Sequence, residues 1–359
     1  MGITEVIRHI PHIYGEYRRL VAAIKKRRPD VAILIDFPDV NLRLARELKK
    51  LNIPVIYFVS PQLWAWKRRR LRWVQQRVDS MMVIFPFEEK FYRARGVDAT
   101  FVGHPLAELP GPTISRDDYA AAHGLDSAKQ WIALLPGSRW KEITANLDAM
   151  IELTHQLSSG FEFLLPVAGT IDRKKLEEYI AGPDEWWPAK PEADLRRLHL
   201  HLVPDAREAL HHARASVVAS GTATIQAAVI GNPFVVVYRV SSITFRLAKR
   251  LVHYSPEIWS AAGTDADDLP IAMVNLIAGR RIVTELLQNR FTAKNVAAAL
   301  APLLAETPQR QRMIADLAQV RDILRPDLNS SSIQRVCDAV EVLLSRSTPA
   351  GGLNATASV

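Results

Sequence analysis

The sequence predicts an α/β protein of two domains, each built on a parallel sheet. Short apolar segments rich in β-branched residues alternate with stretches of helical periodicity, a pattern typical of parallel strands joined by helical crossovers. The 359 residues are enough for two domains of ordinary size. Pro110-Gly111-Pro112 interrupts the alternation and is typical of a linker. We therefore expect domains over residues 1–110 and 111–325, a helix over 326–346 and a disordered tail over 347–359.

Composition narrows the function classes without choosing among them. The one cysteine, Cys337, excludes a disulfide framework and a cysteine-based metal site, and suits a reducing cytoplasm. No stretch approaches the ~18–20 apolar residues of a membrane-spanning helix, and we expect no secretory signal. The formal charge of +8 favours an anionic partner, which could be nucleic acid, a phosphorylated substrate or an acidic membrane surface.

The first half is expected to begin with a helix and to contain few strands. Residues 1–28 show helical periodicity and end in a basic run, and a second helix is expected over 42–51. The expected strands are Val31–Ile35, which we predict to be buried, Val55–Val59, Met81–Phe85 and Thr100–Val102. A doubly wound domain normally leads with a strand and a ligand-binding turn. We therefore expect the first domain to be truncated.

The stretch Asp36-Phe37-Pro38-Asp39-Val40-Asn41 follows the first expected strand. Open α/β sheets place their ligands at the carboxyl ends of strands, and a carboxylate there can act as general base. Alternatively, Asp39 or Asn41 caps the helix that follows. No histidine lies near at ligand spacing, so a metal site is not expected.

Two basic segments also contain apolar side chains that could contact a membrane or another partner. Trp64 and Trp66 precede Arg68 and Arg69, a mixture that suits single-stranded nucleic acid or a membrane interface. In the second segment, apolar positions alternate in helical fashion with basic ones, an amphipathic pattern typical of helices on membrane surfaces. Its candidates are Phe245, Arg246, Lys249 and Arg250. A solvated helix packed on the core is the alternative for this segment.

The second half repeats the strand–helix alternation and contains two small-residue turns. The expected strands are Trp131–Leu135, Phe161–Val167, Leu198–Val203, Ala215–Ala219 and Phe234–Tyr238, followed by mostly helical sequence from about 239 to 345. One turn is Pro136-Gly137-Ser138-Arg139 and the other is Ser220-Gly221-Thr222, each between a strand and a helix. Helix N-termini attract phosphate, and the arginine fork binds two phosphate oxygens. Ordinary capping by Ser220 or Thr222, and a structural ion pair of Arg139, are the alternatives.

Together these stretches resemble the lipid-A-disaccharide synthase family, glycosyltransferases with two Rossmann-like domains (GT-B type). The resemblance runs in family order over nearly the whole chain, and Ser60-Pro61-Gln62-Leu63-Trp64-Ala65-Trp66 is its most specific segment. The other matching segments are residues 35–41, 85–88, 101–106, 134–139, 219–224, 238–240, 247–252 and 275–280.

The resemblance implies an inverting transfer between two acylated sugars. UDP-2,3-diacylglucosamine and 2,3-diacylglucosamine 1-phosphate (lipid X) give UDP and the β-1′,6-linked disaccharide 1-phosphate of lipid A. By motif position, Asp36 would be the base, with Asp39 and Asn41 shaping the site. Two turns would hold the UDP diphosphate. The first contains Gly137, Ser138 and Arg139, and the second contains Ser220, Gly221 and Thr222. Asn275 and Arg280 would complete the nucleotide cleft.

The resemblance also implies the partners. We expect no metal and no cofactor, peripheral binding at the inner face of the cytoplasmic membrane through the two basic segments, no nucleic acid, and a homodimer. The helical C-terminal tail would pack across the domains.

Three departures from the family pattern are expected to matter. The family's first strand and glycine-rich loop are absent. The missing segment corresponds to about two βα units, or roughly 60 residues at ~30 per unit. A start site placed too late would explain its absence, and so would a decayed paralogue. Gln226 stands where a glutamate usually contacts the ribose. The link over residues 256–270 is longer than usual, and Val274 replaces a proline. The alternatives are another UDP-sugar transferase of this fold, an inactive truncated paralogue, or a nucleic-acid-binding protein.

Overall fold

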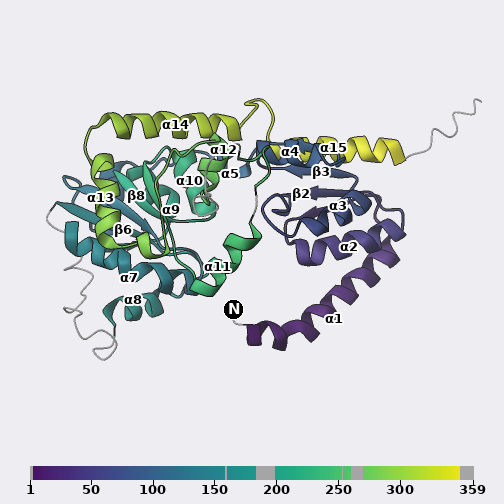
Figure 1. Ribbon diagram of the computed structural model, residues 1–359, viewed down its shortest axis with the longest axis horizontal. Helices are drawn as coiled ribbons and strands as arrows, with labels where there is room; N and C mark the ends of the chain where they lie inside the picture. Colours follow the sequence, from purple (N-terminus) through teal and green to yellow (C-terminus); the bar gives the residue numbers. More distant parts are fainter. Residues whose placement is uncertain (1–2, 158–159, 183–198, 253, 260–269, 348–359) are drawn as a thin grey trace, which may run out of the picture. The chain divides into compact units, whose positions relative to one another are not determined.

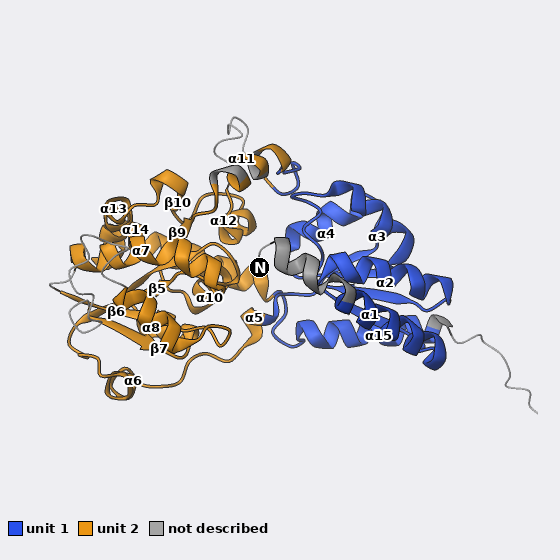
Figure 2. Ribbon diagram, turned by 90° about the horizontal axis from the view of Figure 1, so that it is seen from below, with its two compact units in different colours: residues 1–105, 252–258, 326–359 blue, residues 106–251, 259–325 orange. Residues whose placement is uncertain are grey.

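The computed structural model describes residues 3–157, 160–182, 199–252, 254–259 and 270–347 (Figure 1). The chain divides into two units, shown in blue and orange in Figure 2. Unit 1 comprises residues 1–105, 252–258 and 326–359, and unit 2 comprises residues 106–251 and 259–325. Within the described residues, every helix is too short or too polar to cross a bilayer.

Unit 1 is built on a parallel sheet of four strands. They are β1 (Ala32–Ile35), β2 (Val55–Phe58), β3 (Ser80–Val83) and β4 (Ala99–Phe101). The strands lie in chain order, β1-β2-β3-β4, with Ala32 opposite Val55 and Ile35 opposite Phe58. The four predicted strands are thus confirmed, with ends that differ by one or two residues.

Strand β1 is the edge of this sheet and is only half buried. Leu34 is 6% exposed, whereas Ile33 and Ile35 are 43% and 59% exposed. The expectation of a fully buried strand is therefore wrong for one face. The apolar composition predicted burial on both sides, but none of the described residues covers the face that carries Ile33 and Ile35.

The helices of unit 1 pack on this sheet or on one another. They are α1 (Ile3–Arg27), α2 (Pro38–Lys50), η1 (Arg68–Arg70), α3 (Leu71–Arg77), α4 (Pro86–Arg93) and, at the end of the chain, α15 (Ser332–Ser347). Helix α2 begins at Pro38 rather than Leu42 because the fixed φ of proline suits the first helical position. Helix α15 packs against β2, and Arg335 Nη1 donates to the Val102 carbonyl oxygen at 2.6 Å. The expected disordered tail lies outside the described residues, apart from Ser347.

Unit 2 is built on a parallel sheet of six strands. They are β5 (Gln130–Leu135), β6 (Phe161–Pro166), β7 (Leu200–Val203), β8 (Ala215–Ala219), β9 (Phe234–Tyr238) and β10 (Glu285–Leu287). Their order is β10-β9-β8-β5-β6-β7. The chain therefore builds outward from β5 in one direction and then returns to build outward from β8 in the other. This is the order of doubly wound nucleotide-binding sheets.

Helices cover both faces of the unit 2 sheet. They are α6 (Arg116–His123), α7 (Trp140–Leu157), α8 (Arg173–Ala181), α9 (Ala206–His212), α10 (Thr222–Ile230), α11 (Ser242–Leu251), α12 (Met273–Ala278), η3 (Gln288–Arg290), α13 (Ala293–Leu304) and α14 (Pro308–Leu324); the short α5 (Pro105–Glu108) joins the units. Helix α14 packs on α10 and α12 (Figure 1). Strand β10 was not predicted, because its three residues lie in sequence that was expected to be helical.

Candidate active site

A pocket of about 420 Å³ lies in unit 2 where the strand order reverses. Its walls include the carboxyl ends of β5, β6 and β8, Pro204 directly after β7, and the first turns of α7 and α10. Strands β5 and β8 are neighbours in the sheet although two strands separate them in sequence. The crevice between two such strands is the usual ligand site of open α/β sheets.

The turn after β5 requires glycine at position 137. Gly137 has φ +131°, and a Cβ atom there would lie 2.5 Å from the Glu142 Cβ. Any side chain would therefore clash with α7 as well as strain the backbone. Gly137 allows the turn to fold tightly against the first turn of α7.

Glu142 holds the two backbone N–H groups that follow Gly137. Its Oε2 accepts from Ser138 N at 3.0 Å and from Arg139 N at 3.3 Å, and its Oε1 accepts from Arg139 Nη1 at 2.9 Å. The Glu142 carboxylate thus accepts from the same N–H groups and guanidinium that were predicted to bind phosphate. No role was predicted for Glu142, although a glutamate three residues after the residue that precedes a helix, here Arg139, often accepts from that residue's backbone N–H.

The second turn presents the N-terminus of α10 to the same pocket. Gly221 is the N-cap residue with φ +151°, and no side chain caps the helix. The alternative that Ser220 or Thr222 caps it is therefore wrong. The Thr224 hydroxyl instead donates to the Gly221 carbonyl oxygen at 2.7 Å. The first N–H groups of a helix have no intrahelical partners, so this end of α10 can accept an anion.

Seven of the nine residues predicted to bind the nucleotide line this one pocket. They are Gly137, Ser138, Arg139, Ser220, Gly221, Thr222 and Gln226. They come from two turns more than 80 residues apart in sequence, which the parallel pairing of β5 with β8 brings together.

Asn275 and Arg280 do not line this pocket. The Asn275 side chain is fully buried; it donates to the Val283 carbonyl oxygen and to Glu285, and accepts from two backbone N–H groups. Every polar atom of the amide thus binds the 282–285 segment, and its expected role in the nucleotide cleft stays a prediction. Arg280 forms a two-point ion pair with Asp316 on α14, at 3.1 and 2.5 Å, and lines a different pocket.

In unit 1, Asp36 lies directly after β1 in a backbone held by two side chains. Asn41 Nδ2 donates to the carbonyl oxygens of Ile35 and Asp36 at 2.9 and 2.8 Å. The Tyr57 hydroxyl donates to the Asp36 carbonyl oxygen at 2.5 Å. Asp36 and Phe37 both adopt left-handed φ angles, 45° and 43°. Such strained residues persist where their surroundings fix them and are frequent at functional sites.

The two aspartates differ in their partners. Asp39 is ion-paired with Arg70, and Lys67 Nζ lies 3.9 Å away. The hydrogen bond from Arg70 lowers the pKa of Asp39 below its ordinary value. Within the described residues, no hydrogen bond or ion pair engages the Asp36 carboxylate. Neither Asp39 nor Asn41 is the N-cap of α2, because both lie inside its first turn.

A buried carboxyl group holds the tryptophan segment in place. Glu88 on α4 is 1% exposed. Its Oε1 accepts from the Ser60 hydroxyl at 2.7 Å and from Trp64 Nε1 at 3.0 Å, and its Oε2 accepts from Phe85 N at 3.2 Å. Burial raises the pKa of Glu88 to about 7, although these donors favour the charged form. Glu88 lies in the matching segment 85–88, but no role was predicted for it.

The residues predicted to meet a membrane or the acceptor lie in different environments. Trp64 is 2% exposed and packs edge-on against Phe87, so its expected contact with a membrane surface is wrong. Trp66 is 44% exposed, with Lys67 Nζ 4.2 Å from its ring centre. Arg68 and Arg69 are exposed.

Helix α11 carries the second predicted membrane segment. Phe245 is half-buried, and Arg246 and Arg250 are exposed. Leu247 and Leu251, which the prediction did not single out, are 55% and 54% exposed. The side chain of Lys249 lies outside the described residues. Across the described part of the chain, no three His, Cys, Asp or Glu side chains cluster closely enough to hold a metal ion.

Comparison with known proteins relates this architecture to one family. Residues 1–336 match the family of lipid-A-disaccharide synthetases. The lipid-A-disaccharide synthase of Acidobacterium capsulatum is 51% identical over 349 residues, covering 96% of this chain and 83% of that protein. The enzyme of Koribacter versatilis is 45% identical over 341 residues, covering 95% and 83%.

Solved structures share the fold at much lower identity. UDP-GlcNAc 2-epimerase from Neisseria meningitidis bound to UDP-GlcNAc superposes with a TM-score of 0.53 and 12% identity, covering 92% of this chain and 80% of that one. UGT73P12 from Glycyrrhiza uralensis gives a TM-score of 0.56 and 12% identity, covering 94% and 79%. These likenesses confirm the two-sheet GT-B type of fold. The match over most of the chain and the identity to full-length relatives establish that this chain belongs to the lipid-A-disaccharide synthetase family.

Proposed function

We propose that this chain joins UDP-2,3-diacylglucosamine to 2,3-diacylglucosamine 1-phosphate, releasing UDP and forming the disaccharide 1-phosphate of lipid A. Family membership gives the lipid-A-disaccharide synthase activity. The observation that carries the assignment of the donor site is the pocket between β5 and β8, where seven of the predicted residues gather.

The donor diphosphate is proposed to bind between the first turns of α7 and α10. Both helix N-termini line the pocket, and the uncapped N-terminus of α10 offers backbone N–H groups at the positive end of its dipole. Arg139 supplies a planar fork for two phosphate oxygens. Gln226, half-buried in the same wall, would contact the ribose as a neutral donor or acceptor.

Glu142 gives the donor site an internal anion that the nucleotide must replace or share. Its carboxylate accepts from the N–H groups of Ser138 and Arg139 and from the Arg139 guanidinium. In the free protein it keeps the turn in a binding-competent shape, since the donors stay satisfied. We propose that the diphosphate takes over these donors when UDP-sugar binds.

Asp36 is proposed as the general base. It would take the proton from the 6-hydroxyl of the acceptor while that oxygen attacks the anomeric carbon of the donor sugar. The bond from that carbon to the UDP oxygen breaks, and UDP leaves with the electron pair. One displacement inverts the anomeric configuration. Asp36 suits the role because its carboxylate is unpaired within the described residues, whereas Asp39 is held by Arg70.

Peripheral binding at the inner face of the cytoplasmic membrane is proposed for the delivery of both acylated substrates. Exposed Leu247 and Leu251 lie on a helix whose exposed Arg246 and Arg250 can face anionic headgroups. Exposed Trp66 beside Lys67 is a second such contact. The homodimer implied by the resemblance is a further proposal, which light scattering on the purified chain tests.

The direct test of function is product formation. Purified chain is incubated with the two acylated substrates, and mass spectrometry looks for the tetra-acyl disaccharide phosphate. Product that disappears in Arg139→Ala supports the proposal, and folded, UDP-binding protein that forms no product contradicts it.

A second candidate, a transferase for another UDP-sugar, is favoured by Gln226 at the position of the usual glutamate. A competition series of UDP-sugars against the diacylglucosamine donor separates the two candidates. Faster turnover of a different sugar would support the second.

A further inference from the structure

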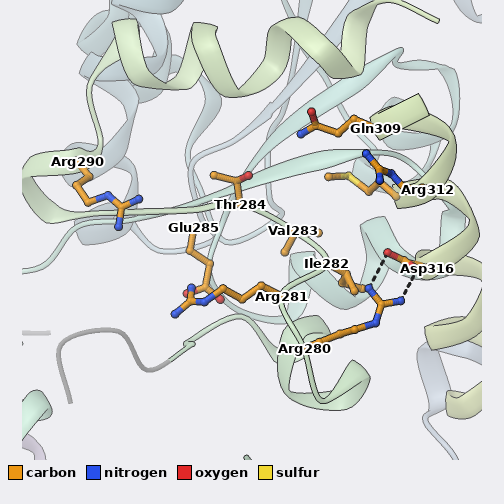
Figure 3. A pocket seen from close by; sticks show the side chains of 11 residues that line it. Arg280, Arg281, Ile282, Val283, Thr284, Glu285, Arg290, Gln309, Arg312 and Asp316 are labelled. Carbon is orange, nitrogen blue, oxygen red and sulfur yellow. Dashed lines mark hydrogen bonds and ion pairs between the residues drawn. The ribbon is translucent and has the colours of Figure 1, made fainter. Parts of the chain in front are cut away.

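Unit 2 has a second pocket, of about 580 Å³, that shares no lining residue with the pocket between β5 and β8. It lies along the 280–285 segment and the start of β10, with α14 as its other wall (Figure 3). Its polar lining is dominated by four arginines, which are Arg280, Arg281, Arg290 and Arg312. The proposed transfer reaction uses none of them.

The two carboxylates of this pocket already have partners. Asp316 forms the two-point ion pair with Arg280, drawn as dashed lines in Figure 3. Glu285 is 5% exposed and accepts from Ile271 N at 3.0 Å, Ala272 N at 3.1 Å and Asn275 Nδ2 at 2.7 Å. Glu285 thus fixes the loop before α12, and Asp316 neutralises only Arg280.

The pocket therefore has an excess of positive charge. Asp316 is engaged by Arg280, and Glu285 is engaged by backbone and amide N–H groups. For Arg290 and Arg312, no ion pair occurs within the described residues. Figure 3 shows Arg290 on one side of Thr284 and Arg312 on the other, both lining the pocket. Arg312 extends from α14, and Arg290 ends the 3₁₀ turn after β10.

We propose that this pocket binds a phosphomonoester carried on a sugar-sized group. A phosphomonoester carries about two negative charges near neutral pH, which matches the two positive charges of Arg290 and Arg312, and arginine forks suit its oxygens. The volume of about 580 Å³ is within the ~300–1,000 Å³ of small-molecule sites and larger than phosphate alone requires. Ile282 and Met313 supply an apolar wall, and Thr284 a hydroxyl group, for the rest of the ligand.

The ligand could come from solution, as a sugar phosphate, or from a bilayer, as a lipid headgroup that ends in a phosphomonoester. Both present the same dianion to the arginines. Because the pocket is separate from the proposed donor site, this inference does not rest on the transfer reaction. Binding is measured on the full chain without turnover.

The first experiment is calorimetric titration of the chain, saturated with UDP, with glucosamine 1-phosphate. The double variant Arg290→Ala/Arg312→Ala is compared with Arg321→Ala, which removes an exposed arginine of α14 outside the pocket. We expect the double variant to lose about tenfold or more in affinity, and the control to bind as the unaltered chain does. Arg290→Gln/Arg312→Gln repeats the test if the alanine variant is less stable.

The second arm uses phosphatidylcholine vesicles with phosphatidic acid, whose headgroup is a phosphomonoester, or with phosphatidylglycerol at equal charge. A loss in the double variant that is confined to phosphatidic acid vesicles identifies a lipid source. A loss confined to glucosamine 1-phosphate identifies a soluble one. Equal binding by the double variant and the control in both arms overturns the proposal, whatever the outcome of the transferase assay.

Discussion

The two parallel sheets obtain their functional residues in different ways. In unit 2, the order of strands reverses between β5 and β8, and the crevice at that reversal holds the two small-residue turns. In unit 1, the strands lie in chain order, and Asp36 follows the edge strand β1. There the local backbone is held by side chains, Asn41 and Tyr57. Topology forms the proposed donor pocket, whereas side-chain hydrogen bonds hold the backbone of the proposed acceptor side.

The largest expected effect separates chemistry in unit 1 from nucleotide binding in unit 2. Asp36→Asn removes the proposed base, and general bases contribute about 10²- to 10⁴-fold. We expect turnover to fall about a thousandfold while the UDP affinity, measured by calorimetry, stays unchanged. If the turnover of Asp36→Asn stays within tenfold of that of the unaltered chain, Asp36 is not the base. The proposal for the donor pocket would then stand alone.

The next effect tests whether side-chain hydrogen bonds hold unit 1. Burial raises the pKa of Glu88 from 4.5 to about 7, so the folded state holds its proton more tightly than the unfolded state. Protonated Glu88 therefore stabilises the folded state fully below about pH 4.5, and this contribution is lost as the pH rises through 7. The difference corresponds to about 3 kcal/mol. Glu88→Gln cannot titrate, so it removes this dependence on pH.

Hydrogen exchange of the peptides that contain β2 and β3, at pH 5.5 and 7.5 after correction for intrinsic exchange, measures this stability. We expect the opening free energy of the unaltered chain to fall with pH and that of Glu88→Gln to stay level. The control is Glu89→Gln, the neighbouring glutamate, whose carboxylate is partly exposed and paired with Arg93; it should retain the fall. An equal fall in Glu88→Gln contradicts the role of its carboxyl group.

A smaller effect tests the boundary of the donor pocket in unit 2. Arg139→Ala removes a charge-assisted contact to phosphate, which is worth about 1.5–3 kcal/mol, so UDP should bind about 10- to 100-fold more weakly. Arg280→Ala is the matched control, since Arg280 is paired with Asp316 outside this pocket. Calorimetry that finds the larger loss in Arg280→Ala would reassign the nucleotide cleft.

The smallest effect concerns the membrane surface. Leu247→Ser/Leu251→Ser removes two half-exposed apolar side chains from α11. We expect sedimentation with anionic vesicles to weaken by several-fold, because partial burial of a leucine contributes about 1 kcal/mol. Turnover on detergent-dispersed substrates should stay the same. Leu328→Ser, at a residue 74% exposed in unit 1, is the control, and an equal loss there would argue against a specific role of α11.

The sequence predicted most of the fold and the two turns that line the pocket between β5 and β8, because these depend on local patterns. Apolar runs predicted nine of the ten strands found in the part of the chain that the structure describes, and the two glycine turns predicted which loops meet at the sheet edge. The three-residue β10 escaped prediction because it is too short to show a period.

Contacts between distant residues could not be predicted. Asn275 matched a motif, yet its amide forms hydrogen bonds with the backbone of the loop that leads into β10. Trp64 carried a membrane signal in sequence, but it packs against Phe87 in the core, where Glu88, 24 residues later, accepts the hydrogen bond of its indole N–H. Glu142 was visible only as a helix start, whereas its hydrogen bonds to the turn depend on the backbone geometry at Gly137.

The assembly of unit 1 from three separate chain segments has a consequence for synthesis on the ribosome. The sheet of unit 1 is translated first, yet α15, which packs on β2 and binds the carbonyl oxygen of Val102, is translated after the whole of unit 2. Unit 2 can therefore complete its fold while the earlier sheet still lacks a covering helix. During that interval the nascent chain exposes the surface of β2 that α15 will later cover.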